Sequence, residues 1–300
     1  MRFVRLLALV LFPLALCAQN LTGLIDMHVH SDPDSIPRSI DAIDLAKLAK
    51  QRGMRGLVLK NHFEPTASLA YIVRKEVPGI EVFGGIALNL AVGGVNPVAV
   101  ERMASVKGGW GRVVWMPTLD AENQVRFSKE NRPFVSVVRN GQVTPEVKEV
   151  LGIIAKRNLI FETGHISPAE SLLLIREAKR LGVKKMVVTH CMEPFINMSV
   201  AQMQEAAKLG AYLEFTYAVL IPQTVPMPRP AAYDIHELAA AIRAVGPDHC
   251  ILSSDLGQRG SPLHPDGLAA FFQALRGQGF TEAEINRMAK KNPADLLGLP

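Results

Sequence analysis

The chain has 300 residues, of which 48% are hydrophobic and 20% are charged, and its formal net charge is +5. A chain of this size and composition can bury one large core, and α/β barrels of this length commonly form a single domain. The charge is small and the basic residues are intermixed with acidic ones, as on solvated helix faces, so a nucleic-acid partner is not expected.

The first 18 residues differ in composition from the rest of the chain. Arg2 and Arg5 precede the apolar run Leu6–Leu16, and small residues follow it. This order predicts a cleaved signal peptide over residues 1–18, because the apolar run is too short to span a bilayer core of about 30 Å. Cys17 would permit lipidation, but the bulky residue before it disfavours a lipid anchor. We therefore expect a secreted or periplasmic protein that makes no membrane contact after cleavage.

Short apolar runs recur along the rest of the chain, each bounded by turn residues and followed by a helical pattern. They are Gly23–Val29, Gly56–Lys60, Ile80–Ala87, Arg112–Met116, Leu159–Thr163, Lys185–Thr189, Ala211–Thr216 and Cys250–Ser254. Strands that alternate with helices imply parallel βαβ units, and eight such units in one domain imply a closed barrel. We predict that residues 19–300 form a single (β/α)₈ TIM barrel of the α/β class.

Two connections are longer than a plain βα unit requires. Ala121–Val143, after the fourth strand, contains Asn140 and Gly141 next to a short apolar stretch, which predicts a β-hairpin insertion. Val219–Ala232, after the seventh strand, is rich in proline and cannot form a regular helix or a central strand. Both follow strands, so we expect them to line or cover the active-site face, with surface decoration as the alternative for the hairpin.

Five of the eight histidines lie at or just beyond the ends of predicted strands, where barrel active sites form. These five are His28, His30, His62, His165 and His190. The other three are expected elsewhere: His236 in a helix, His249 before the eighth strand and His264 in a loop. Roughly one histidine would fall at the strand ends by chance, so the excess indicates a functional cluster.

The first strand and the last strand supply the groups expected to bind a metal ion. His28 and His30 are two residues apart on one strand, so both side chains are predicted to face the barrel interior. Such a pair can bind one cation, although a buried, hydrogen-bonded pair is the alternative for the two residues alone. Asp255 ends the last strand and could bind the same cation and accept a proton from its water, whereas a helix cap is its structural alternative.

The order of these groups resembles the ligand set of the amidohydrolase superfamily, and the closing segment NPADLLGL resembles the last helix of many members. The resemblance covers the whole chain after the signal peptide. It implies that His28, His30 and Asp255 bind one divalent ion and that His165 and His190 bind a second ion or orient the substrate. It also implies that a metal-bound hydroxide attacks a carbonyl or phosphorus centre.

One part of the superfamily pattern is missing. Two-metal members carry a carboxylated lysine or a glutamate at the end of the fourth strand, and the sequence here, VVWMPT, contains neither. Lys60 on the second strand is a substitute, because it shares strand parity with His62 and a buried lysine loses its proton readily. Lys60 is thus a bridging ligand, carboxylated or not, or a cation that pairs with Asp26 or Asp255 and binds an anionic substrate. His62 is a further candidate ligand, and the run LKNHFEPT around both residues resembles an uncharacterised bacterial branch of amidohydrolase-like proteins.

Three further residues are candidate substrate contacts, namely Trp115, Glu162 and Tyr217. Glu162 is also a reserve bridging ligand, although its strand parity is opposite to that of His165. Nitrogen and oxygen ligands accept Zn²⁺, Mn²⁺, Fe²⁺ or Co²⁺, and we expect one or two ions per chain, with Zn²⁺ as the first choice.

The leading hypothesis is a metal-dependent hydrolase that cleaves a C–N or C–O bond of a small molecule, such as an amide, a cyclic amide, a lactone or an ester. A phosphoesterase with a larger histidine-rich metal cluster and a single-metal decarboxylase are alternatives. A periplasmic metal-binding barrel without activity is the non-enzymatic alternative, and Asp255 argues against it because catalysis needs a proton acceptor. Association into a homo-oligomer is left open.

Overall fold

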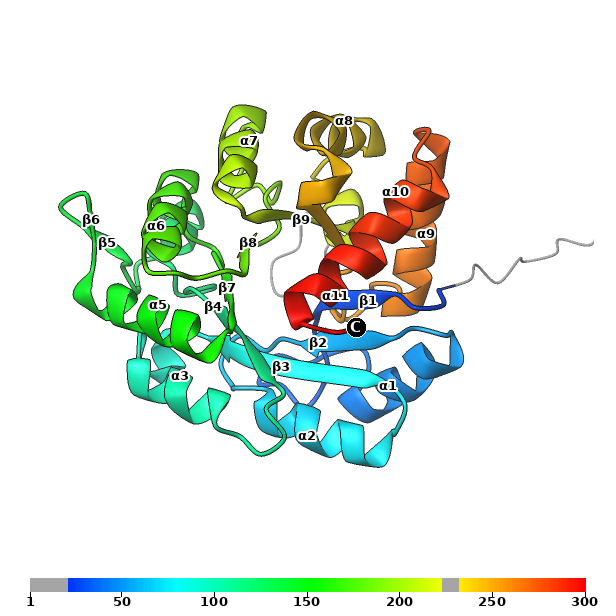
Figure 1. Ribbon diagram of the computed structural model, residues 1–300, viewed down its shortest axis with the longest axis horizontal. Coiled ribbons are helices and arrows are strands. Elements are labelled where there is room, and N and C mark those ends of the chain that lie inside the picture. The colour runs from blue at the N-terminus through cyan, green and yellow to red at the C-terminus, as the bar shows by residue number, and fades with distance from the viewer. Residues whose placement is uncertain (1–20, 223–231) are drawn as a thin grey trace, which may run out of the picture.

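Eight parallel strands form one sheet that curves into a barrel (Figure 1). They are β1 Ile25–Val29, β2 Gly56–Leu59, β3 Glu81–Ala87, β4 Gly111–Trp115, β7 Ile160–Glu162, β8 Met186–Val188, β9 Tyr212–Thr216 and β10 Cys250–Ser253. Each pairs in parallel with the next barrel strand along the chain. The eight strands and the (β/α)₈ barrel predicted from the sequence are confirmed.

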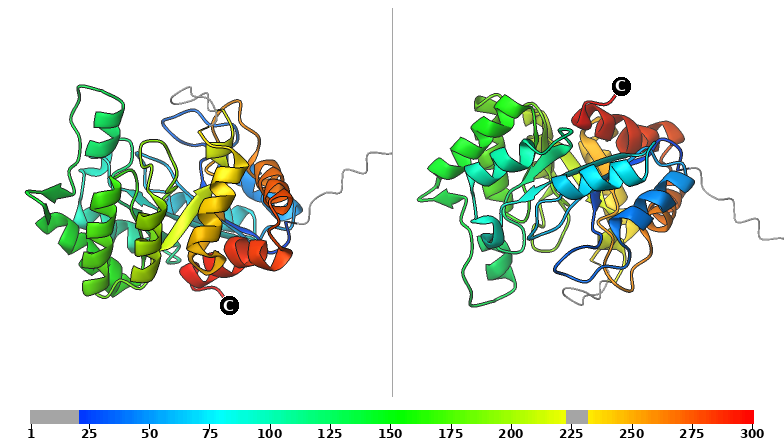
Figure 2. Two further views of the ribbon diagram at one scale, coloured as in Figure 1. Left: turned by 90° about the horizontal axis from the view of Figure 1, so that it is seen from above. Right: turned by 90° about the horizontal axis from the view of Figure 1, so that it is seen from below.

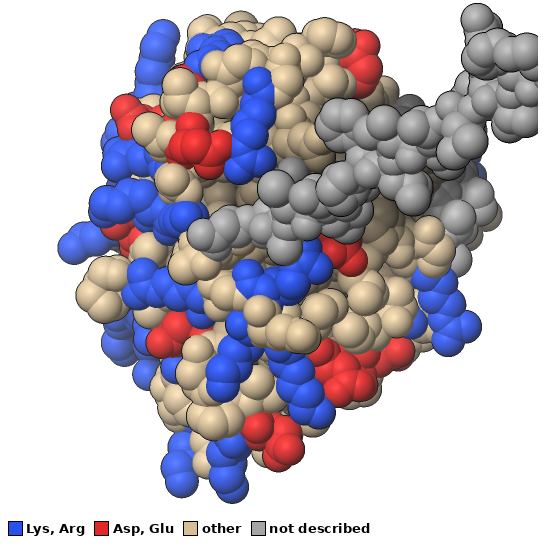
Figure 3. All heavy atoms as spheres, turned by 90° about the vertical axis from the view of Figure 1, so that its right-hand side faces the viewer, with Lys and Arg blue, Asp and Glu red and all other residues tan. Residues whose placement is uncertain are grey.

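The computed structural model describes residues 21–222 and 232–300. The predicted signal peptide lies outside these residues, and so does most of the proline-rich connection Val219–Ala232. Within the described residues, no helix is both long and apolar enough to cross a membrane. Basic and acidic side chains are intermixed on the face shown in Figure 3.

Helices follow the strands and cover the outside of the barrel, as Figure 2 shows from two sides. They are α1 Ala42–Gln51, α2 Ala67–Glu76, α3 Pro97–Ala104, α5 Pro145–Arg157, α6 Pro168–Arg180, α7 Val200–Leu209, α8 Ile235–Val245 and α9 His264–Gly277. Short 3₁₀ turns occur at η1 Leu90–Val92, η2 Tyr217–Leu220 and η3 Pro247–His249. The chain closes with α10 Glu282–Asn286, a π-helical turn at Arg287–Lys291 and α11 Asn292–Leu297.

Local sequence explains where several helices begin. α3, α5 and α6 each start with a proline, which lacks the N–H that a first helical residue cannot use. The side chains before these prolines, Asn96, Thr144 and Ser167, each accept a hydrogen bond from the backbone N–H of the third helical residue. These caps set the ends of the βα loops that carry the site.

The connection after β4 contains the short helix α4, Glu122–Phe127, and the antiparallel pair β5 Val138–Arg139 and β6 Gln142–Val143. Asn140 and Gly141 both have positive φ, 52° and 72°, as a two-residue hairpin turn requires. The predicted hairpin is therefore confirmed. It lies at the outer edge of the molecule beside α5 (Figures 1 and 2). In contrast, Asn123 of α4 donates hydrogen bonds to the backbone oxygens of His165 and Phe195 in the loops after β7 and β8.

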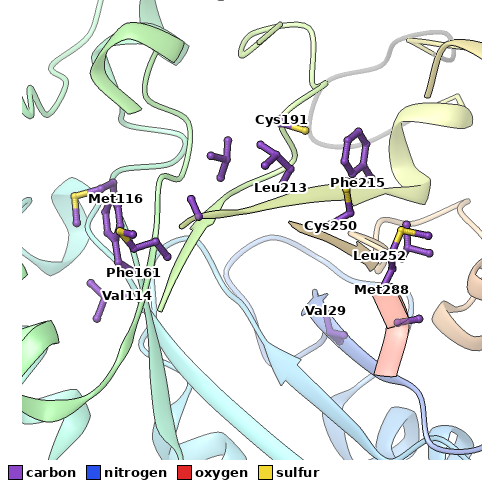
Figure 4. Packing of buried hydrophobic residues seen from close by; sticks show 14 of the residues in the cluster. Val29, Val114, Met116, Phe161, Cys191, Leu213, Phe215, Cys250, Leu252 and Met288 are labelled. Atoms are coloured by element: carbon purple, nitrogen blue, oxygen red, sulfur yellow. The ribbon is translucent and has the colours of Figure 1, made fainter. Parts of the chain in front are cut away.

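Two apolar clusters hold the barrel together. The larger one lies between the sheet and the helices, and Figure 4 shows part of it, including Val114, Phe161 and Leu213. The smaller one fills the barrel interior at the amino ends of the strands, where Ile25, Met27 and other inward side chains pack against α11. Because the apolar plug occupies that end, polar side chains gather at the carboxyl ends.

β1 contains a bulge that decides which side chains enter the barrel. Asp26 pairs with Leu57 and Val29 pairs with Leu59, so β1 has one residue more than β2 between these pairs. An extra residue changes the alternation of side chains between the two faces. Met27 accordingly belongs to the inner cluster and Val29 to the outer cluster, while the intervening His28 also points inward and contacts Lys60.

The barrel closes between β1 and β10 at the end where the candidate metal ligands lie. The N–H of Asp255 donates to His28 O and the N–H of His30 donates to Leu256 O, both at 3.0 Å. Two residues before His28 on β1, the Asp26 carboxylate accepts a hydrogen bond from the N–H of Ser254 at 3.0 Å. This closure brings His28 and His30 next to Asp255.

Candidate metal centre

His28, His30 and Asp255 form a compact trio at the carboxyl ends of β1 and β10. Asp255 Oδ1 lies 3.0 Å from His28 Nε2 and 3.1 Å from His30 Nε2. One nitrogen or oxygen atom from each side chain lies within 4.8 Å of the others. All three residues are buried, and they come from opposite ends of the sequence.

The donor set of this trio fits a divalent cation. Ligands that surround zinc tetrahedrally at ~2.1 Å lie roughly 3.4 Å apart, which is close to the separations found here. Two imidazole nitrogens and one carboxylate oxygen are the ligands that zinc and similar ions prefer. A fourth position remains for water or substrate, as in catalytic sites.

Glu214 on β9 completes the support of this trio and was not anticipated from the sequence. Its Oε2 lies 3.1 Å from His28 Nδ1 and accepts a hydrogen bond from the N–H of His190 at 2.9 Å. A carboxylate in this position accepts a hydrogen bond from Nδ1–H, and this tautomer leaves Nε2 of His28 with a free lone pair for a cation. The available signal was an acidic residue inside the apolar run of the seventh barrel strand.

Ionisation also favours the trio as a cation site. Burial lowers the pKa of His30 well below its usual value, and the neighbouring charge of Arg38 lowers it further. Burial alone would raise the pKa of Asp255, but His28 and the hydrogen bond from His30 hold it well below its usual value. His30 therefore offers a neutral imidazole and Asp255 an ionised carboxylate, which are the forms that bind metal.

Lys60 lies beside the trio, as its strand parity predicts. Its Nζ is 2.8 Å from His28 Nε2, and burial lowers the pKa of its ammonium group. The ion pair considered with Asp26 or Asp255 is not found among the described residues. Lys60 instead faces the nitrogen of His28 that would bind the cation.

Glu162 and Trp115 form the layer beneath Lys60. The indole N–H of Trp115 donates to Glu162 Oε2 at 2.7 Å, and the hydroxyl of Thr189 donates to the same oxygen at 3.2 Å. Burial, and then the charge of Glu214, raises the pKa of Glu162 well above its usual value. Lys60 Nζ lies 5.7 Å from the centre of the Trp115 ring. Trp115 therefore supports the floor of the site.

His62, His165 and His190 extend the cluster across the mouth of the barrel. The ring centre of His62 lies 5.0 Å from that of His30 and 5.9 Å from that of His165. The rings of His165 and His190 are 4.8 Å apart. All five histidines predicted from strand ends thus gather at one site.

These three histidines differ in whether their Nδ1 atom has a hydrogen-bond partner. Nδ1 of His62 lies 2.9 Å from Thr118 Oγ1, which also accepts a hydrogen bond from the side chain of Asn89. In contrast, the buried Nδ1 atoms of His165 and His190 have no hydrogen-bond partner among the described residues. The buried Nδ1 of His30 also has no partner among the described residues, and a buried nitrogen without a partner is costly.

Tyr217, a candidate substrate contact, lies in η2, and its ring centre is 5.9 Å from that of Phe271 on α9. One sequence prediction differs from the structure. The placement of His264 in a loop is wrong, because it begins α9 and is buried. His264 donates from Nε2 to Leu256 O at 2.7 Å and so holds the segment that follows β10.

Arg38 is a second residue that sequence reasoning missed. It lies in the loop after β1, and its guanidinium forms a buried ion pair with Asp34, with Nη2 and Oδ2 2.6 Å apart. Its charge contributes to the lowered pKa of His30 and of His62. No motif distinguishes this arginine from those on the surface.

Fold and site together define a (β/α)₈ barrel with a buried histidine–aspartate trio at the carboxyl ends of its strands, the arrangement that the resemblance to the amidohydrolase superfamily implied. The chain belongs to the family of unknown function DUF6282, whose model matches residues 23–214. None of the curated proteins compared with the chain matches it in sequence.

Several solved structures share the fold. Organophosphorus hydrolase from Deinococcus radiodurans has a TM-score of 0.63 and 15% identity, with 93% of each chain covered. An amidohydrolase from Pseudomonas aeruginosa has a TM-score of 0.62 and 14% identity, with 92% of this chain and 95% of that chain covered. A resiniferatoxin-binding protein from Rhodobacter sphaeroides has a TM-score of 0.62 and 16% identity, with 93% and 91% covered. At these identities the likeness shows the fold alone.

Proposed function

We propose that this protein is a metal-dependent hydrolase that cleaves a C–N or C–O bond of a small molecule. The observation that carries the proposal is the trio His28, His30 and Asp255, with Glu214 behind it, at the barrel face where active sites form. The solved structures of the same fold include an organophosphorus hydrolase and an amidohydrolase, which supports the same class of chemistry.

Within the trio, Asp255 is the group suited to move a proton. Its side chain is 12% exposed, whereas those of His28 and His30 are 1% and 2% exposed, so water and substrate reach the aspartate first. Its low pKa keeps it ionised and ready to accept a proton from a water molecule and pass it to the leaving group. A divalent ion bound by the trio would lower the pKa of that water and polarise the scissile carbonyl.

A second ion would be held by Lys60, His165 and His190, with His62 at the edge of the cluster. The unpartnered Nδ1 atoms of His165 and His190 support this assignment. Lys60 would serve through a carboxylated Nζ, because burial favours the neutral amine that reacts with carbon dioxide. With a single ion, the same histidines would orient the substrate.

Hydrolysis of a phosphoester is the second candidate. It is favoured by the fold shared with organophosphorus hydrolase and by the number of histidines in the cluster. The two candidates differ in the geometry of the reacting centre, which is planar in a carbonyl compound and tetrahedral in a phosphate ester.

The proposal is tested by metal analysis and by a substrate panel. We expect purified protein to contain zinc or a similar ion and to hydrolyse lactones, esters or amides faster than phosphotriesters. His28→Asn should lose the bound ion and at least about 100-fold of the activity. The matched control is His236→Asn, because His236 is an exposed histidine on α8. A metal-free enzyme whose activity survives His28→Asn would refute the proposal.

We also propose that the protein is exported. The support is the composition of residues 1–18, which lie outside the described residues. Sequencing the amino terminus of protein from a periplasmic fraction should give a chain that begins near residue 19. A cytoplasmic protein that retains Arg2 and Arg5 would contradict this.

A further inference from the structure

The side chain of Phe195 lies against the histidine cluster, although its position in the sequence does not indicate this. Phe195 is in the loop between β8 and α7, and its ring centre is 4.6 Å from that of His165 and 5.4 Å from that of His190. It is partly exposed. A partly exposed ring in contact with two site histidines is positioned to touch whatever the site binds.

A second phenylalanine extends this surface outward. The ring of Phe127, at the end of α4, meets that of Phe195 edge to face, with the centres 6.2 Å apart. Phe127 is 53% exposed, which makes it one of the most exposed large apolar side chains among the described residues. Continuous exposed apolar surface beside a polar site is typical of ligand-binding regions.

Asn123, one turn before Phe127 on α4, fixes this arrangement. Its side-chain amide donates to the backbone oxygen of His165 at 3.1 Å and to that of Phe195 at 2.7 Å. One amide therefore ties the loop after β7 to the loop after β8. The two phenylalanines and the two histidines are held at a fixed spacing by α4, the helix that the longer connection after β4 adds to the plain barrel unit.

We propose that Phe195 and Phe127 form a subsite for an aromatic ring of the substrate, next to the bond that is cleaved. Such a ring would pack on Phe195 in the edge-to-face manner that the two phenylalanines already show. The role of this subsite in catalysis rests on the proposed function. Its ability to bind an aromatic ring does not depend on that function.

Turnover is the first test of the subsite. Methyl phenylacetate, methyl cyclohexylacetate and methyl acetate share the reacting bond and the leaving group and differ only in the apolar part. We expect kcat/KM to be highest for methyl phenylacetate. Phe195→Ala should lower that value about tenfold, and lower the value for methyl acetate much less, given the strength of aromatic contacts. Phe127→Ala should act in the same direction by a smaller factor.

Ring binding without turnover is the second test. Saturation-transfer NMR with phenylacetamide and hexanamide on chelator-treated protein should show binding of phenylacetamide that is lost in Phe195→Ala. Ile72→Ala is the matched control, because Ile72 is 52% exposed on the outer helix α2. It should change neither binding nor turnover. If Phe195→Ala does not fold, Phe195→Leu and the exposed Phe127→Ala replace it.

The outcomes separate the subsite from the proposed function. Binding that depends on Phe195, without turnover of any ester, supports the subsite and counts against the hydrolase. Turnover with no preference for the phenyl ring, unchanged in Phe195→Ala and Phe127→Ala, overturns the subsite and leaves the hydrolase standing. Equal binding of phenylacetamide and hexanamide also overturns the subsite.

Discussion

Glu214 and His28 form a pair in which a carboxylate selects the tautomer of an imidazole that we propose as a metal ligand. The carboxylate is 3.1 Å from Nδ1, on the side of the ring away from Asp255. Burial alone would raise the pKa of Glu214, but His28 and the N–H of His190 lower it, so the carboxylate is ionised. A buried charge of this kind increases the basicity of Nε2 and fixes the ring.

This pair yields a prediction for metal affinity. Glu214→Gln keeps an oxygen that accepts hydrogen bonds but removes the charge, so the affinity for zinc should fall about 10–100-fold. Competition with a chelating dye measures this affinity. Glu64→Gln is the control, because Glu64 is exposed and should leave the affinity unchanged. Equal affinities in both variants would show that Glu214 does not support the metal ligand.

His264 yields a prediction for the pH dependence of stability. Burial lowers its pKa from 6.5 to about 4, so the folded chain takes up this proton later than the unfolded chain as the pH falls. The stability that depends on a neutral His264 is complete above pH 6.5 and decreases toward pH 4. His264→Gln should therefore lose less stability than the wild type between pH 7 and pH 4.5, by up to about 3 kcal/mol.

Urea unfolding at the two pH values measures this difference. The other buried histidines contribute equally to wild type and variant, so only the difference between them reports on His264. His236→Gln, at an exposed position, should follow the wild type. A variant as acid-sensitive as the wild type would contradict the assignment.

At the scale of elements, irregular backbone at the ends of β1 and β10 positions the ligands. The bulge in β1 turns His28 inward, and Asp255 has a positive φ of 52°. Gly257 follows with a φ of 121°, a conformation that side chains rarely adopt, and a Cβ there would overlap the backbone oxygen of His30. The two chain segments approach this closely only because residue 257 lacks a side chain.

Gly257→Ala tests this close approach. The φ angle and the overlap with His30 should both destabilise the folded variant. We therefore expect a loss of about 2–4 kcal/mol in unfolding free energy and weaker zinc binding. Gly141→Ala is the matched control, because Gly141 also has positive φ, 72°, but open space around it. It should cost only about 1–2 kcal/mol and leave metal binding unchanged. Equal effects on zinc binding would mean that the approach to His30 is unimportant.

At the scale of the whole molecule, the barrel separates an apolar plug at one end from a buried polar cluster at the other. The plug includes Ile25 and Met27 on β1 and packs against α11. The polar end contains several charges and buried nitrogens without partners, which oppose folding unless a cation binds. The trio also joins β1 to β10, where the barrel closes.

The stability of the whole barrel should therefore depend on the metal. Zinc at about 100 times its dissociation constant should add ~2.7 kcal/mol, or roughly 5–10 °C in Tm for a chain of this size. Thermal unfolding with and without a chelator measures the shift. His28→Asn should abolish most of it, while His236→Asn should retain it. A Tm that is the same with and without zinc would show that the trio binds no metal in the folded state.

The sequence alone determined the barrel, the hairpin after β4 and the set of histidines at the site. These depend on short-range signals: alternating strand and helix patterns, an Asn-Gly turn, and the position of each histidine at a strand end. The carboxyl ends of parallel strands meet at one face, so strand position was enough to bring His62, His165 and His190 near His28.

Only the tertiary structure decided which side chains lie against the candidate metal ligands. Glu214, Arg38 and Phe195 act through neighbours that are distant in the sequence, and no local pattern encodes such distances. The bulge in β1 depends on the register with β2, so strand parity predicted the inward direction of His28 without its cause. Tertiary packing likewise buried Trp115 beneath Lys60 and turned Tyr217 toward α9, because the space around each ring is set by elements that meet only in the folded barrel.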